Sequence, residues 1–279
     1  MTVEIPATSR LLVPRTRRLA PFAPIGLPSL GGLRPVILPI ATAALVLALW
    51  QGVVFAFRVP HVILPPPSDI AVELWRMLPA LLQNALPTTA DSLMAFFAAT
   101  LLGIGIAIVL TYSPVLRDTL YPNLILFQLI PKVALAPLFV VWLGISSQSR
   151  VTFATFISFF PIVISAVVGF ASAEKSALRL CRSLTASEWQ SFVMVRFPFA
   201  LPAIFSGMKV AMTMAIIGVI IGEFISAKAG LGYYILYASS RMETALIFAA
   251  LFVLCVIGVA LFGAVALAEQ LVRRVYGRQ

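Results

Sequence analysis

Four ionisable side chains fall inside long apolar segments of this sequence: Asp91, Lys132, Lys209 and Glu223. A charge in hydrocarbon is costly, so such residues usually pair with one another or face a water-filled cavity. We predict that Asp91 and Glu223 lie on or beside the path of a transported solute, with Lys132 as a counter-charge. The alternative is an ion pair that only holds helices together. Lys209 lies near the end of its segment, where a structural role is expected.

Sequence motifs for catalysis, metal binding or cofactor binding are absent. No G-x-x-x-x-G-K-[ST] phosphate-binding loop occurs, so the chain is not expected to hydrolyse ATP itself. The only histidine, His61, is expected in a loop, which makes a Ser-His-Asp triad implausible. Cys181 and Cys255 have no metal-ligand spacing and are not expected to pair. We therefore expect no catalytic residue, no metal and no cofactor.

The composition is that of a membrane protein. Apolar residues make up 61% of the chain and charged residues 11%, against about 25% charged in soluble domains. We predict an all-α polytopic protein with a basic, disordered tail over residues 1–35 and a transmembrane domain over residues 36–279. Its six predicted spans, each near the ~20 residues that cross a bilayer, are 36–57, 87–112, 119–143, 151–171, 201–226 and 244–268.

The distribution of positive charge predicts the orientation. With both termini in the cytoplasm, thirteen of the 20 Lys and Arg residues fall in cytoplasmic segments and five in the outer loops, as the positive-inside rule requires. This places the chain in the cell membrane, explains its net charge of +10 without nucleic acid, and puts loop 172–200 in the cytoplasm. In the first outer loop, Ser68 is a candidate N-cap for a short interfacial helix that carries Trp75.

The loop over residues 185–202 contains an amphipathic segment between two apolar spans. Thr185 and Glu188 have capping-box spacing, and Trp189 and Phe192 follow at helical spacing. Two prolines should end this helix and start the next one: Pro198 and Pro202. The helix is too short and polar to span a bilayer, so we expect a partner to dock there, with Trp189 and Phe192 as anchors.

Two other patterns concern the spans themselves. The third span contains three prolines, at 122, 131 and 137, which predict a kinked helix whose freed carbonyls suit a gated path. In the fifth span, Gly218 and Gly222 form a G-x-x-x-G pair that predicts close contact with a neighbouring helix.

Several motifs together resemble a known family. PKVALAPLFVVWLG at 131–144, FPFALPAIFSG at 197–207, and GEFI at 222–225 followed by GLGY at 230–233 are similar to the ABC importer permeases of the nitrate, taurine and alkanesulfonate branch. Within it, YSPVLR at 112–117 and SFFP at 158–161 look most like members linked to thiamin-pyrimidine precursors or riboflavin.

The resemblance implies a type I permease core of five helices plus one N-terminal helix. It also implies a dimer, two ABC ATPase subunits and an extracytoplasmic solute-binding protein. The transported solute would be pyrimidine- or riboflavin-like, or sulfonate-, taurine- or nitrate-like. The loop at 172–200 would receive the push of the ATPase. Residues predicted to couple to that subunit are Thr185, Ser187, Glu188, Trp189, Gln190 and Phe192.

The sequence departs from the family pattern inside this loop. Arg179, Leu180 and Cys181 stand where the family has Glu-Ala-Ala, and Thr185 stands where its glycine is expected. If that position needs a positive φ, Thr185 is strained. An alternative function stays open: an ion-coupled secondary transporter that uses the charged residues of the spans. A membrane enzyme is disfavoured because no catalytic constellation is present.

Overall fold

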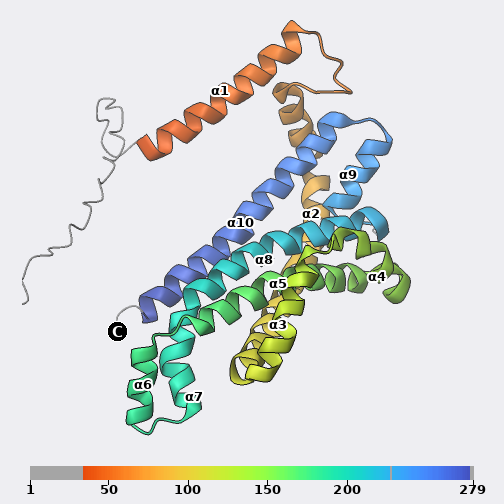
Figure 1. Ribbon diagram of the computed structural model, residues 1–279. Helices are drawn as coiled ribbons and strands as arrows, with labels where there is room; N and C mark the ends of the chain where they lie inside the picture. Colours follow the sequence, from red (N-terminus) through yellow and green to blue (C-terminus); the bar gives the residue numbers. More distant parts are fainter. Residues whose placement is uncertain (1–33, 227, 277–279) are drawn as a thin grey trace, which may run out of the picture. The chain divides into compact units, whose positions relative to one another are not determined.

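The computed structural model describes residues 34–226 and 228–276, and every regular element within them is a helix (Figure 1). The predicted tail at 1–35 lies outside the described residues except for Arg34 and Pro35, which already belong to the first helix. The chain divides into two compact units, Met1–Leu47 and Ala48–Gln279. The first helix, α1 (Arg34–Ala56), crosses this division, and its apolar side chains from Ile37 to Leu47 are exposed.

The second unit holds the remaining helices. They are α2 (Pro67–Tyr112), α3 (Pro114–Leu129), the 3₁₀-helix η1 (Lys132–Leu135), α4 (Ala136–Leu143), α5 (Ser147–Ala171), α6 (Lys175–Ser183), α7 (Glu188–Ser191), the π-helix η2 (Phe192–Arg196), α8 (Phe197–Ser226), α9 (Leu231–Ser240) and α10 (Thr244–Tyr276).

Five of the described helices are long and apolar enough to cross a membrane, and a sixth span results if α3 is joined to η1 and α4. That pair is bent by 88°. The break falls at Ile130, which is extended with φ −66° and ψ 134°. Proline at the next position, Pro131, disfavours the helical conformation of the residue before it. The predicted break is therefore confirmed at Pro131, where it is sharper than a kink, whereas Pro122 lies inside α3 and Pro137 lies at the start of α4.

The second span differs from the prediction. Helix α2 is continuous over 46 residues, so the expected interfacial helix is its first part. Its N-cap is Pro66, and Ser68 instead bonds to Gln51. Two prolines lie inside α2 without ending it: Pro79 and Pro87. Side chains near Pro87 bond to main-chain carbonyls one turn earlier, Asn84 to Ala80 and Thr88 to Asn84, which is how membrane helices tolerate proline.

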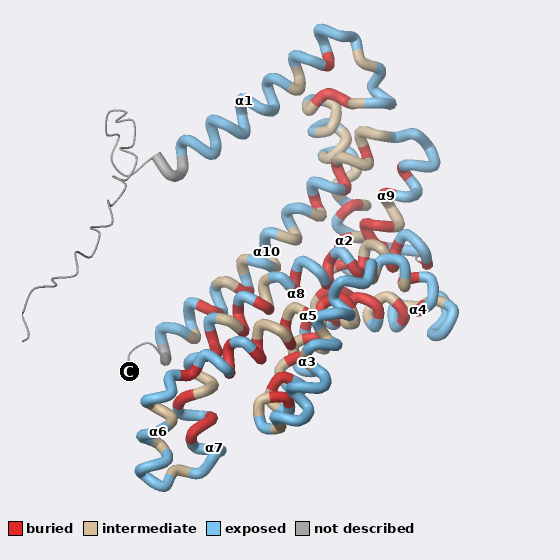
Figure 2. The backbone as a smooth tube through the Cα atoms, viewed as in Figure 1, coloured by how far each residue is buried: buried red, intermediate tan, exposed pale blue. Residues whose placement is uncertain are grey.

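The core lies where α2, α5 and α8 pack together, and Figure 2 shows buried residues along all three. Glycines of α8 let α5 approach closely. A Cβ on Gly218 would lie 2.7 Å from the Cα of Ala154, and one on Gly222 would lie 2.9 Å from Cγ of Arg150. The close contact that the G-x-x-x-G pair predicts is thus confirmed.

Candidate functional site

Between α5 and α8 the chain forms α6, a short turn and α7 at one end of the second unit (Figure 1). Helix α7 starts with a capping box made by Ser187 and Gln190. Ser187 Oγ accepts from the Gln190 N–H at 3.2 Å, and Gln190 Oε1 accepts from the Ser187 N–H at 2.8 Å. The predicted box of Thr185 and Glu188 is therefore wrong by two residues. An N-cap needs an extended backbone, and Thr185 has φ +56°.

Thr185 belongs to the end of α6 rather than to the start of α7. Its N–H donates to the Arg182 carbonyl at 3.1 Å, and the Ala186 N–H donates to the Cys181 carbonyl at 3.0 Å. These two bonds make a Schellman motif, whose left-handed position is usually glycine. Thr185 occupies that position with a β-branched side chain, so the expected strain is present.

Replacing Thr185 by glycine should therefore stabilise the turn between α6 and α7. A left-handed non-glycine residue costs about 1–2 kcal/mol, so amide hydrogen exchange in α6 should slow by roughly tenfold. The matched control is Leu184→Gly, because Leu184 has φ −89° and gains nothing from glycine; its α6 amides should exchange at the same rate or faster. Faster exchange in Thr185→Gly would contradict the assignment of strain to this residue.

The two predicted aromatic anchors have different environments. Trp189 is 65% exposed, whereas Phe192 is 3% exposed. The Phe192 ring stacks under Trp189 at 5.7 Å and 20°, and its other neighbours include Phe170 at 5.2 Å and Tyr112 at 5.7 Å. Phe192 thus packs between Trp189 and the helices α5 and α2, and it supports the Trp189 ring from below. Because Phe192 is itself buried, it does not present its own surface to a partner.

The chain does not break after α7. The π-helix η2 leads directly into α8, and the Phe197 N–H donates to the Phe192 carbonyl. Pro198 and Pro202 therefore do not end the helix, contrary to the prediction. A π-turn shifts the hydrogen-bond register, and Pro198 lies in the first turn of α8, where proline is tolerated. The segment Glu188–Ser226 is accordingly one continuous helical unit of 39 residues.

Asp91 is buried and paired with Arg150, one residue outside the predicted span 151–171. Its Oδ2 accepts from Nε of Arg150 at 3.0 Å and from NH2 at 2.9 Å, and its Oδ1 accepts from Ser147 at 2.6 Å. Lys132, predicted as the counter-charge, bonds to the Gln128 carbonyl at 2.9 Å and lies 4.9 Å over the Phe160 ring. The Asp91 pair therefore ties α2 to α5 and does not involve Lys132.

Glu223 holds the start of α9. Its Oε1 accepts from Thr88 at 2.7 Å, and its Oε2 accepts from the Gly232 N–H at 2.7 Å. The neighbouring amides are also engaged: Leu231 N–H donates to Thr88 Oγ1 at 2.9 Å, and Gly230 N–H donates to Asn84 Oδ1 at 3.0 Å. We call this set, Asn84, Thr88, Glu223 and the amides of 230–232, the α9 clasp. A carboxylate is favourable at a helix N-terminus.

The sequence analysis did not identify Asn84, which binds the Gly230 amide, or Thr88, which binds Glu223, as members of the α9 clasp. The signal that could have found them is the spacing of Asn84, Thr88 and Asp91, which puts three polar residues on one face of a helix. Lys209 has the structural role expected of it, since its Nζ pairs with Glu269 of α10 at 2.5 Å. Within residues 34–226 and 228–276, no group of three acidic, His or Cys side chains is placed to hold a metal.

Comparison with known proteins gives a consistent result. Residues 99–275 match the family described as "Binding-protein-dependent transport system inner membrane component". The chain is 34% identical to the riboflavin transport system permease protein RibX of Chloroflexus aurantiacus, with 94% of each chain covered. It is 30% identical to the taurine transport system permease protein TauC of Escherichia coli, covering 80% of this chain and 84% of the relative.

A solved structure shows the same fold. A chain of the MetNI methionine ABC transporter, determined in inward-facing conformations, superimposes with a TM-score of 0.60 at 19% identity. The match covers 72% of this chain and 98% of that one. At this identity the likeness concerns the arrangement of the helices.

Proposed function

Because the chain belongs to the family of inner membrane components of binding-protein-dependent transport systems, we propose that it moves a small organic solute inward by alternating access, driven by ATP hydrolysis on a partner chain. The chain is a multi-pass membrane protein and the permease subunit of an ABC importer, of the branch that the sequence motifs predict. The single observation that carries the coupling proposal is the exposed Trp189 on a capped helix that continues into α8.

The surface proposed to receive the ATPase is made of exposed residues of the turn after α6, of α7 and of η2. Leu184 is 70% exposed, Trp189 is 65% exposed and Met194 is 71% exposed. Exposed aromatic side chains with a rigid support are frequent interface hot spots. The capping box holds Ser187 and Gln190 to each other, so Glu188 and Trp189 are presented on a defined turn. Thr185 fixes the turn before them.

In this proposal a push on Trp189 reaches the spans by two routes. One is the continuous helical segment from Glu188 to Ser226, which rises about 1.5 Å per residue and so carries a displacement along its length. The other is Phe192, which contacts Phe170 of α5. Movement of α5 and α8 together would change which side of the membrane the solute path faces. Arg179, Leu180 and Cys181 replace the family's Glu-Ala-Ala in α6, whereas residues 187–190 match the family pattern better, so docking is assigned to α7.

The remaining partners follow from the family. We propose a pair of permease chains, two identical copies, with an ABC ATPase on each at the α6–α7 end and a solute-binding protein at the opposite, α9 end. Both termini would then be cytoplasmic. Relatives are named for riboflavin, taurine and formylaminopyrimidine transport, which supports the proposal of a small organic solute of one of these kinds. Dependence of uptake on ATP in reconstituted vesicles separates this function from ion-coupled secondary transport.

Trp189→Ala should abolish retention of the ATPase subunit that copurifies with the wild-type chain from its native membrane. Loss of a hot-spot aromatic costs about 2 kcal/mol or more, which is roughly a thirtyfold weaker association. The matched control is Trp142→Ala, because Trp142 of α4 is equally exposed at 65%. Equal ATPase retention by both variants, with equal ATP-driven uptake, would refute docking on α7.

A further inference from the structure

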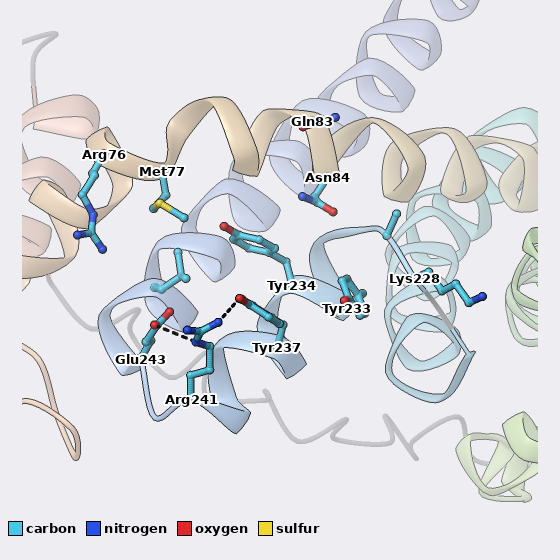
Figure 3. A pocket seen from close by; sticks show the side chains of 12 residues that line it. Arg76, Met77, Gln83, Asn84, Lys228, Tyr233, Tyr234, Tyr237, Arg241 and Glu243 are labelled. Atoms are coloured by element: carbon cyan, nitrogen blue, oxygen red, sulfur yellow. Dashed lines mark hydrogen bonds and ion pairs between the residues drawn. The ribbon is translucent and has the colours of Figure 1, made fainter.

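At the end of the second unit that carries α9, a cavity of about 740 Å³ opens between α2, α9 and the start of α10 (Figure 3). Its volume lies within the range usual for sites that bind small molecules. Asn84 lines this cavity and also holds the Gly230 amide, so the cavity adjoins the α9 clasp. A solute bound here would contact the same loop that Glu223 fixes.

One wall of the cavity is aromatic. Three tyrosines of α9 lie side by side in it (Figure 3). The rings of Tyr234 and Tyr237 are stacked at 6.0 Å and 21°, and those of Tyr233 and Tyr237 lie 6.5 Å apart at 31°. The face of an aromatic ring favours a flat ligand that can stack on it. Within the described residues, the hydroxyls of Tyr233 and Tyr234 make no hydrogen bond to protein groups.

Every polar side chain that lines the cavity, except the Glu243 carboxylate, can donate a hydrogen bond. Three basic residues line it, Arg76, Lys228 and Arg241, against one carboxylate, Glu243. Arg241 is oriented by the Tyr237 hydroxyl and by Glu243 at 3.4 Å, while Lys228 forms no ion pair among the described residues. Arg76 is paired with Glu73 at 2.7 Å and Arg241 with Glu243, so among the described residues Lys228 is the basic group of the lining that no carboxylate balances. Its positive charge disfavours cationic solutes. It suits solutes whose edges carry carbonyl oxygens and ring nitrogens, which accept hydrogen bonds.

We propose that this cavity binds a planar heteroaromatic solute with several hydrogen-bond acceptors, of the flavin or pyrimidine type, by stacking it on Tyr234 and Tyr237. The inference rests on the proposed import function and names its solute class. Small aliphatic sulfonates would use the basic residues but have no ring to place against the tyrosines. The aromatic wall is therefore the feature that selects between the solute classes of the relatives.

The test uses the full chain in lipid nanodiscs, without ATPase or binding protein, and riboflavin as the probe. Fluorescence anisotropy of riboflavin should report saturable binding. Tyr234→Leu and Tyr237→Leu should each weaken it about tenfold, equivalent to about 1.4 kcal/mol, and Tyr234→Phe should stay within about threefold of wild type. Trp142→Ala, which alters an exposed aromatic outside the cavity, should bind as wild type does. Taurine should not displace the probe.

Three results would overturn the inference: no riboflavin binding by the wild-type chain, binding that is unchanged in both leucine variants, or displacement by taurine at comparable concentration. The Tyr234→Phe variant separates loss of stacking from misfolding, because it keeps the ring. Copurification of the ATPase with the same variants from native membrane, measured separately, keeps this test distinct from the proposed function. A chain that retains its ATPase but does not bind riboflavin would lose only the solute assignment.

Discussion

Asp91→Ala should lower the free energy of unfolding by about 3–5 kcal/mol, because it leaves the Arg150 guanidinium buried without its partner. The two side chains are 5% and 11% exposed, and both guanidinium contacts to the carboxylate are lost together. Ser147 also loses its acceptor. The expected result is a much lower yield of folded protein and a melting temperature in detergent well below that of wild type.

A double variant separates this structural role from a place on the solute path. Asp91→Leu combined with Arg150→Met removes both charges, and apolar replacement of a buried pair is often neutral for stability. It should restore most of the melting temperature that Asp91→Ala loses. If the pair only holds helices together, uptake should recover with it. Recovery of stability without recovery of uptake would instead place Asp91 on the solute path. Normal stability with altered transport in an Asp91→Asn variant would lead to the same conclusion.

The membrane spans were predictable because the contributions of many consecutive apolar residues add up. Some twenty apolar residues in succession decide a membrane helix whatever its neighbours are, and the break after Ile130 follows from the local geometry of Pro131 alone. The predicted boundaries were wrong at prolines that can either end a helix or be accommodated within it. Pro87 continues α2 and Pro198 continues from η2 into α8, since nearby side chains or a π-turn adjust the backbone bonds that proline disturbs.

The candidate site was less predictable, because its partners are distant in sequence. Thr88 and Glu223 are separated by 135 positions, and no local pattern pairs them. Arg150 lies one residue before the predicted span 151–171, whereas α5 already starts at Ser147. The added turn brings Arg150 against Asp91. A shift of two residues likewise moved the capping box from Thr185 to Ser187, since the conformation at Thr185 depends on how α6 ends.

Glu223→Ala should release the N-terminus of α9 while the rest of the second unit stays folded. The substitution removes both acceptors of the α9 clasp and leaves the buried Gly232 amide and the Thr88 hydroxyl without their partner. Each buried group left unsatisfied costs about 1–3 kcal/mol. Amides at the start of α9 should therefore exchange with solvent about a hundredfold faster, a change equivalent to roughly 2.7 kcal/mol.

Two matched variants make the Glu223 result specific. Glu223→Gln keeps one carbonyl oxygen and so loses one acceptor, which should give an intermediate exchange rate. Glu243→Ala removes a carboxylate that flanks α9 but is 43% exposed and outside the clasp, so amide exchange at residues 231–232 should stay near the wild-type rate.

The clasp also adjoins the tyrosine-lined cavity through Asn84. Riboflavin binding should hence weaken in Glu223→Ala, because the α9 tyrosines lose their fixed position. Unchanged exchange at 231–232 together with impaired uptake would mean that Glu223 acts on the solute directly, and the structural reading of this carboxylate would fail.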